Sequence, residues 1–217
     1  MIKNNWKEIW RKRTGDLNVL ENTSGGGLLE LKKINGFDVV GEGLTYEVGG
    51  GSGATLFLFE KDGIRCGEID YSENLVEIAR GVLQTNDIEC GEAIDLKIFP
   101  QYDAVLSNSV FSYFPSEEYA LQVLEKMYLK ARRSIGIIDV HDRDKEMEFI
   151  EYRKKTIENY EERYKGLHKL FYSREFFRNF AKNHNMKVVF KESNISGYWN
   201  NEFVFNCYFT KYNELNE

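Results

Sequence analysis

The sequence predicts an α/β fold in which a mostly parallel, doubly wound sheet is covered by helices on both faces. Strand-like and helical segments alternate between residues 44 and 140. A glycine run at 49–53 follows the first strand-like segment, as in a tight turn from strand to helix. The last two strand-like segments, 187–195 and 202–210, have only a loop between them, which predicts a C-terminal antiparallel hairpin.

Composition indicates a folded protein and limits the classes of partner. The chain has 217 residues, of which 42% are hydrophobic, so one domain with a substantial core is expected. A net charge of −6 argues against a nucleic-acid partner. The three cysteines are far apart and form no CxxC pair, which favours a reducing compartment and no metal site. No segment has the length of a membrane span or a leader, so we expect a cytoplasmic location.

The remaining elements follow from apolar periodicity and from serines placed at helix starts. The strands expected before the hairpin are 44–48, 64–69, 92–96, 102–107 and 134–140. The helices expected are 3–13, 28–34, 54–60, 72–84, 116–131 and 173–183, with Ser72, Ser116 and Ser173 as N-caps. We divide this single domain into an N-terminal helical cap (1–40), a core (44–140), a helical insertion over the acceptor (141–185) and the hairpin (186–212).

The strongest local signal is the segment Glu47-Val48-Gly49-Gly50-Gly51-Ser52-Gly53-Ala54. Glycines at such a turn let the backbone approach a ligand with no Cβ in the way. Asp70 ends the next strand, where a carboxylate can accept both ribose hydroxyls of an adenosine. The combination is more specific than a glycine turn alone, although Gly49-x-Gly51-x-x-Ala54 also satisfies the dinucleotide fingerprint.

The glycine segment resembles motif I of the class I S-adenosylmethionine-dependent methyltransferases, (E/D)-x-G-x-G-x-G, through Glu47, Gly49, Gly51 and Gly53. The segment 67–80, with Gly67, Asp70, Ser72 and Ala79-Arg80, is similar to the family's G-x-D-x-S…A-R motif. Residues 91–96 and 102–111 resemble its later "G-D-A…L" and "F-D-x-V" segments. The resemblance covers about residues 44–140 and implies a Rossmann-like, seven-stranded sheet whose last strand is reversed.

The resemblance implies S-adenosyl-L-methionine as cofactor and assigns it a set of binding residues. Glu47 orients the glycine loop or reaches the amino end, and the loop backbone contacts the homocysteine and ribose. Asp70 holds the ribose, while Tyr71, Glu92 and Ala93 lie at the adenine. The full predicted set is Glu47, Gly49, Gly50, Gly51, Gly53, Asp70, Tyr71, Glu92, Ala93, Ser107 and Asn108.

The acceptor is expected outside the carboxyl ends of the strands, where ligands of open parallel sheets bind. Candidate catalytic residues there are His141, Asp139 and Tyr113. His141 is the preferred general base because the unperturbed pKa of histidine lies near neutrality, although an exposed loop histidine is the plainer interpretation. The acidic surface and aromatic strand ends favour a small-molecule acceptor, and the oligomeric state stays open.

Two other functions remain possible from the sequence. A nicotinamide-dependent oxidoreductase could use the same doubly wound core, but its fingerprint usually has an apolar residue in place of Glu47. A catalytically silent cofactor-binding module would keep the same glycine and Asp70 motifs.

Overall fold

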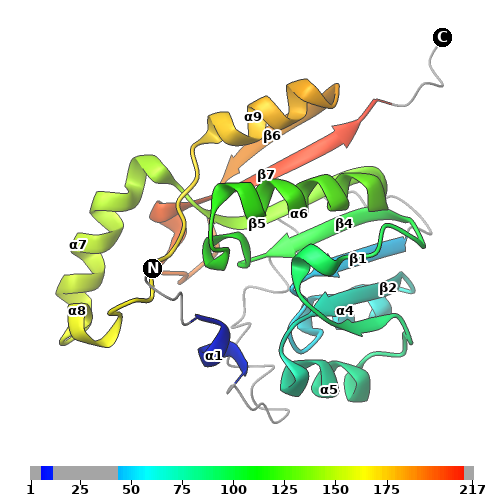
Figure 1. Ribbon diagram of the computed structural model, residues 1–217, viewed down its shortest axis with the longest axis horizontal. Helices are drawn as coiled ribbons and strands as arrows, with labels where there is room; N and C mark the ends of the chain where they lie inside the picture. Colours follow the sequence, from blue (N-terminus) through cyan, green and yellow to red (C-terminus); the bar gives the residue numbers. More distant parts are fainter. Residues whose placement is uncertain (1–5, 12–43, 213–217) are drawn as a thin grey trace.

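A seven-stranded sheet forms the centre of the computed structural model, which describes residues 6–11 and 44–212 (Figure 1). The strand order is β3-β2-β1-β4-β5-β7-β6. The strands are β1 (Leu44–Val48), β2 (Arg65–Asp70), β3 (Ile88–Cys90), β4 (Tyr102–Asn108), β5 (Ala131–His141), β6 (Met186–Glu192) and β7 (Val204–Lys211). Strands β1 to β5 pair in parallel, and β7 runs antiparallel to both β5 and β6. The predicted mostly parallel sheet with a reversed C-terminal hairpin is confirmed.

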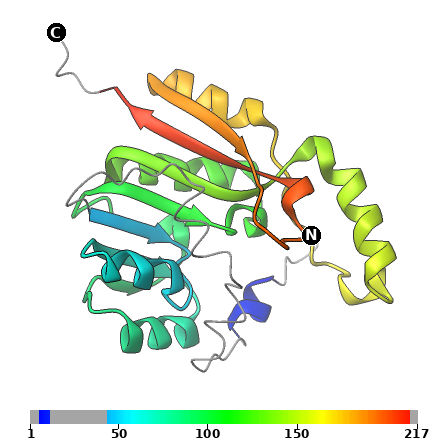
Figure 2. The ribbon, with the colours of Figure 1, turned by 180° about the vertical axis from the view of Figure 1, so that it is seen from behind.

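Helices cover both faces of this sheet, because neighbouring residues of a buried strand point to opposite sides. Helices α4 (Ala54–Lys61) and α5 (Glu73–Val82) cover one face, and α6 (Glu117–Lys130) and α9 (Arg174–Asn183) cover the other (Figures 1 and 2). On β4, Val105 packs in the core beneath α6 and α9, whereas its neighbour Leu106 packs beneath α4 and α5. The middle of strand β4 is therefore apolar on both of its faces, from Ala104 to Leu106.

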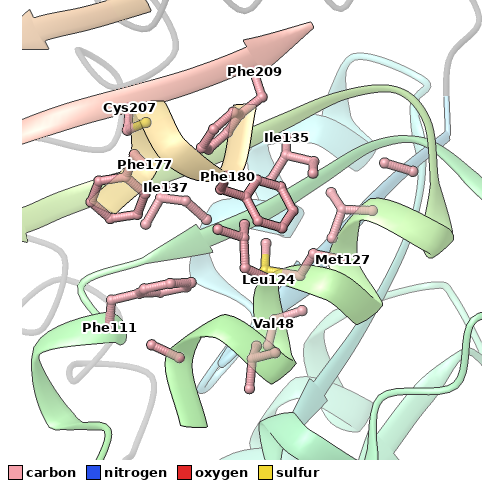
Figure 3. Close-up of a cluster of buried hydrophobic side chains, with 14 of the residues drawn as sticks. Val48, Phe111, Leu124, Met127, Ile135, Ile137, Phe177, Phe180, Cys207 and Phe209 are labelled. Atoms are coloured by element: carbon pink, nitrogen blue, oxygen red, sulfur yellow. The ribbon is translucent and has the colours of Figure 1, made fainter. Parts of the chain in front are cut away.

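The larger core lies between α6, α9 and the strands β4, β5 and β7 (Figure 3). Its fully or almost fully buried side chains include Phe111, Leu124, Met127, Ile135, Ile137, Phe177, Phe180, Cys207 and Phe209. Each large apolar side chain buried in this way contributes about 1.5–3 kcal/mol to folding. The core thus fixes the positions of β4 and β5, whose carboxyl ends carry the candidate acceptor residues.

The carboxyl ends of β4 and β5 are followed by short elements that gather at one edge of the sheet. These are the 3₁₀ turns η2 (Phe111–Tyr113) and η3 (Arg143–Lys145), then α7 (Glu146–Thr156) and α8 (Tyr160–Arg163). Helix α1 (Trp6–Arg11) lies at the same edge (Figure 1). The indole Nε1 of Trp6 donates to His168 O (2.9 Å), and Ser72 Oγ donates to Trp10 O (3.1 Å). Helix α1 is therefore connected to the turn between β2 and α5 and to the segment after α8.

One predicted strand is wrong. Residues 93–95 form a 3₁₀ turn, η1 (Ala93–Asp95), and the short strand β3 lies earlier. The register pairs Asp70 with Cys90, after which Gly91 N donates to Asp70 O (2.9 Å). Because β2 has no further residue to pair, the apolar residues after Gly91 turn away from the sheet.

Two of the three predicted serine caps are observed. Ser116 Oγ accepts from Tyr119 N at the start of α6, and Ser173 Oγ accepts from Phe176 N at the start of α9. Ser72 precedes α5 but its hydroxyl bonds to Trp10 O instead. The expected loop and helix at 22–34 lie outside the described residues. In the described part of the chain, no helix is both long and apolar enough to cross a membrane.

Adding a methyl group at Gly67 tests how closely β2 packs. A Cβ at Gly67 would lie 2.6 Å from the Tyr102 hydroxyl and 3.0 Å from Asp87 O. We expect Gly67→Ala to lower the free energy of unfolding by about 1–3 kcal/mol. A Cβ at Gly81, in α5, meets no atom within 4 Å, so Gly81→Ala should raise that free energy by up to about 1 kcal/mol. Urea denaturation measures both, and a fully stable Gly67→Ala would contradict this packing.

Candidate cofactor and acceptor site

The glycine loop leaves β1 through a sharp turn. Gly49, Gly51 and Gly53 all have positive φ angles, between 63° and 78°. At Gly49 a Cβ would also lie 2.4 Å from Val110 Cγ2, so no other residue fits there without displacing the start of η2. Gly49 N donates to Ile69 O (2.7 Å), which anchors the loop over the end of β2.

Asp70 connects the glycine loop to the end of β2. One carboxylate oxygen accepts from Gly51 N (3.0 Å) and the other from Ser72 N (2.8 Å). Burial raises the pKa of this carboxyl, while the N–H donors of Ser72 and Gly51 oppose that rise. Each oxygen uses one of its two acceptor positions, so each can still accept a hydroxyl. This arrangement fits the ribose diol that the sequence assigned to Asp70.

The other predicted cofactor residues lie at the same edge of the sheet. Tyr71 and Ala93 are half-buried, and Glu92 Oε2 accepts from the Tyr119 hydroxyl (3.3 Å). Ser107 is fully buried, and its hydroxyl donates to Val48 O (3.0 Å), which joins β4 to β1. Asn108 is the last residue of β4. The structure brings these residues around the carboxyl ends of β1, β2, β3 and β4, and their role in binding the cofactor stays a prediction.

Two carboxyl groups lie side by side beneath the glycine loop. Glu47 and Glu68 are register partners on β1 and β2, and both are buried. A Cβ at Gly50 would lie 2.1 Å from Glu68 Oε2, so this carboxyl lies directly against the loop backbone. Among the described residues, neither Glu68 oxygen has a hydrogen-bond partner. Burial, and then repulsion by neighbouring acids, raises the pKa of Glu68; burial also raises that of Glu47. The sequence motif predicted Glu47 and gave no sign of the second carboxyl.

On the acceptor side, Asp139 is fixed by several hydrogen bonds. Its carboxylate accepts from Ser109 Oγ (2.6 Å), from the Tyr198 hydroxyl (2.9 Å) and from Asn200 Nδ2 (3.4 Å). Asp139 and Ser109 both have positive φ angles, 60° and 57°. Strained backbone of this kind is concentrated at functional sites. Burial, and then the charge of Asp139, raises the pKa of Tyr198.

His141 is enclosed by aromatic rings instead of facing solvent. Its exposed fraction is 1%, and its ring packs edge-on against Phe149 (5.0 Å) and Phe171 (5.3 Å). Burial, and then the charges of Lys169 and Arg153, lowers its pKa well below the usual value. A neutral imidazole of such low pKa is a weak proton acceptor. The role of His141 as a general base therefore stays a prediction, and its surroundings do not favour it.

Tyr113 lies in a group of aromatic side chains. Its ring is edge-on to those of Trp6 (5.0 Å between centroids) and Trp10 (5.4 Å), and Lys169 Nζ lies 4.8 Å from its centroid. Tyr113 belongs to η2, directly after β4, so it faces the same edge as the cofactor residues. Helix α1 thus contacts a predicted acceptor residue through both of its tryptophans.

Lys169 is the site residue that the sequence analysis missed. It is partly buried, and its Nζ lies 3.5 Å from His141 Nε2. Burial is the main reason that its pKa falls to about 8; the charge of Arg153 lowers it further, and that of Asp139 opposes the fall. The signal in the sequence was a lone lysine inside the apolar run Leu167 to Phe171. That signal is weak, because many such lysines simply extend to solvent.

The acid-rich stretch after β5 does not form a metal site among the described residues. No group of three or more His, Cys, Asp or Glu side chains is arranged to hold a metal ion in the ranges 6–11 and 44–212. Asp142 instead accepts from Asp144 N (3.0 Å) and forms an ion pair with Arg174 (3.1 Å).

The sheet order and the contact of Asp70 with the glycine loop describe a doubly wound α/β domain, and a family model matches part of it. Residues 46–134 match the family model described as a methyltransferase domain. This match covers less than half of the chain, and it agrees with the motif resemblance to the class I S-adenosylmethionine-dependent methyltransferases. An oxidoreductase or a silent module finds no support. A comparison of the sequence with curated proteins gives no match.

Solved structures share the fold at low sequence identity. The PH0226 protein from Pyrococcus horikoshii OT3 is 17% identical, with a TM-score of 0.69 over 94% of this chain and 99% of that one. Magnesium protoporphyrin IX methyltransferase from Synechocystis PCC 6803 with bound SAH is 13% identical, with a TM-score of 0.60 over 96% and 93%. The plantazolicin methyltransferase BpumL in complex with SAH is 18% identical, with a TM-score of 0.64 over 98% and 100%.

Glu68→Gln tests the buried carboxyl pair beneath the loop. A raised pKa means that the native state keeps a proton that the unfolded chain loses above its ordinary value of 4.5, so the free energy of unfolding falls as pH rises from there. Glutamine stays neutral at every pH. We expect the variant to be more stable than the wild type at pH 8, by at least about 1 kcal/mol, with the difference disappearing near pH 5.

Denaturation in urea between pH 5 and pH 8 measures this difference. The exposed Glu151 provides the control, because Glu151→Gln should show no such pH dependence. A Glu68→Gln variant less stable than the wild type across the whole range would mean that Glu68 stabilises the fold as an ion.

Proposed function

We propose that this enzyme transfers the methyl group of S-adenosylmethionine to a small molecule that binds between the ends of β4 and β5 and the elements α1, α7 and η2. The observation that carries the cofactor side is the Asp70 carboxylate, which holds Gly51 N (3.0 Å) and Ser72 N (2.8 Å) and retains acceptor capacity on both oxygens. The cofactor supplies a methyl group already activated on a sulfonium.

The residues proposed to hold the cofactor fit its chemical parts. The loop Gly49–Gly53 provides backbone with no Cβ against the amino-acid half, and Asp70 accepts from the ribose. Tyr71, Glu92 and Ala93 would line the adenine, in agreement with their common position at the ends of β2 and β3. Ser107 and Asn108, at the end of β4, would lie between cofactor and acceptor.

The protein's task at the acceptor is positioning and the exclusion of water. Correct alignment of two reactants can supply about 7–11 kcal/mol of the barrier. We propose that Asp139 and Tyr113 position the acceptor. Three hydrogen bonds fix the Asp139 carboxylate, and packing against α1 fixes the Tyr113 ring. Helix α1, which bonds to Ser72 and His168, would cover the space between them.

Two features favour a small acceptor over a macromolecule: the net negative charge of the chain and the helices that stand at the edge of the sheet. The net charge of −6 repels polyanions, and α1 and α7 both stand at the edge where an acceptor would enter (Figure 1). The similar proteins include a magnesium protoporphyrin IX methyltransferase and a plantazolicin methyltransferase.

A labelling experiment tests the size of the acceptor. When the protein is incubated with a cell extract and with S-adenosylmethionine tritiated in its methyl group, we expect the tritium to pass to molecules that dialysis removes. Tritium found only in protein or nucleic acid would contradict a small acceptor.

Asp70→Ala tests the cofactor assignment. The change removes charge-assisted hydrogen bonds worth about 1.5–3 kcal/mol each, so S-adenosylhomocysteine should bind at least about tenfold more weakly. Titration calorimetry measures the affinity, and the exposed Glu73, in the first turn of α5, provides a control as Glu73→Gln. NADP should give no heat. Unchanged affinity in Asp70→Ala would remove Asp70 from the ribose site.

A further inference from the structure

The residues on both sides of Lys169 attach its backbone to the acceptor side. The carbonyl of His168 accepts from Trp6 Nε1 (2.9 Å), and Leu170 N donates to Ser112 O (2.8 Å). These bonds attach the segment to α1 and to η2, the turn that follows β4. The backbone on both sides of Lys169 is therefore attached to neighbouring elements.

The ammonium of Lys169 has no anionic partner within ion-pair distance among the described residues. Its neighbours are His141 Nε2 (3.5 Å) and the ring of Tyr113 (4.8 Å to the centroid). The charge of Asp139 attracts it, but the oxygens of that carboxylate already accept from Ser109, Tyr198 and Asn200. An ammonium removed from water without such a partner is costly, and a bound anion would offset that cost.

A second cation adds to the positive potential at this place. Arg153, on α7, donates to the Tyr164 hydroxyl (2.9 Å), and its guanidinium lies 4.9 Å from the centroid of Trp199. Its charge lowers the pKa of both His141 and Lys169. The acceptor side therefore carries excess positive charge within a chain whose net charge is −6.

We propose that Lys169 binds the carboxylate of the acceptor, so that this methyltransferase selects a small acid with an aromatic body. The proposal rests on the methyl-transfer function proposed above. A single ammonium beside a neutral imidazole matches one carboxylate, whereas phosphate groups are usually bound by several donors. The rings of Tyr113, Trp6 and Trp10 provide the apolar surface that an aromatic body would contact. Lys169 is thus a specificity-determining residue, and the methyl acceptor atom lies elsewhere on the same molecule.

This assignment has a pH dependence of known sign. The groups that face the ammonium are Asp139 and His141 on β5, Arg153 on α7 and Tyr113 on η2. The lysine pKa is lowered to about 8, so the cation is present at pH 7 and is lost as pH rises through that value. Carboxylate affinity should therefore decrease between pH 7 and pH 10. An arginine at position 169 stays charged over this range and should abolish the decrease.

The experiment uses the protein saturated with S-adenosylhomocysteine and two matched pairs of probes, benzoate with benzamide and indole-3-acetate with indole-3-acetamide. Titration calorimetry measures the four dissociation constants at pH 7. We expect each acid to bind at least about tenfold more tightly than its amide, because only the acid forms the charge-assisted bond. Lys169→Met should reduce this ratio to about one, and Lys169→Arg should preserve it. Lys165→Met changes an exposed lysine of the same segment and should leave the ratio unchanged.

Each result decides between named alternatives. A wild type that binds acids and amides equally, or binds none of the four probes, overturns the proposal while leaving methyl transfer intact. A preference that survives in Lys169→Met assigns the carboxylate to another residue and overturns it as well. Failure of the wild type to bind S-adenosylhomocysteine would instead remove the methyltransferase function. Equal affinity for that nucleoside in all variants separates loss of acceptor binding from misfolding.

Discussion

The contact between the Asp70 carboxylate and the glycine loop is the interaction on which the cofactor side depends. It joins three pieces of chain, because Asp70 ends β2, Gly51 lies in the turn after β1, and Ser72 precedes α5. The same residue offers its carbonyl to Gly91 N and thereby ends β3. A single residue thus sets the relative positions of the glycine loop and of the turns after β2 and β3.

The parallel sheet explains why the remaining residues meet at one place. The carboxyl ends of parallel strands lie at the same edge, so residues far apart in sequence become neighbours. Ser109 follows β4 and Asp139 lies near the end of β5, yet they are joined by a 2.6 Å hydrogen bond. The antiparallel β7 contributes as well, because Asn206 Oδ1 accepts from Asp139 N (3.0 Å) and supports the strained backbone there.

Acidic and basic side chains occupy different parts of this edge. The carboxyl pair of Glu47 and Glu68 lies beneath the glycine loop, where burial favours the protonated, neutral forms. Lys169 and Arg153 lie on the other side, where Asp139 already accepts hydrogen bonds from Ser109, Tyr198 and Asn200. The net charge of the chain does not predict the local charge beneath the glycine loop or around Lys169. Each local charge depends on which side chains the fold brings together.

The sequence by itself determined the elements whose signals are local. Glycines at fixed spacing after an apolar strand, an acid at the end of the next strand, and serines before α6 and α9 all act within a few residues of chain. The tertiary structure alone decided three other matters: the place of β3, the burial of His141 and the site of Lys169. Strand β3 depends on how far β2 extends beside it. His141 and Lys169 depend on rings supplied by α7, η2 and α1. The sequence identifies a residue as histidine or lysine. Its pKa and its partners depend on neighbours that are distant in the sequence, so only the tertiary structure shows them.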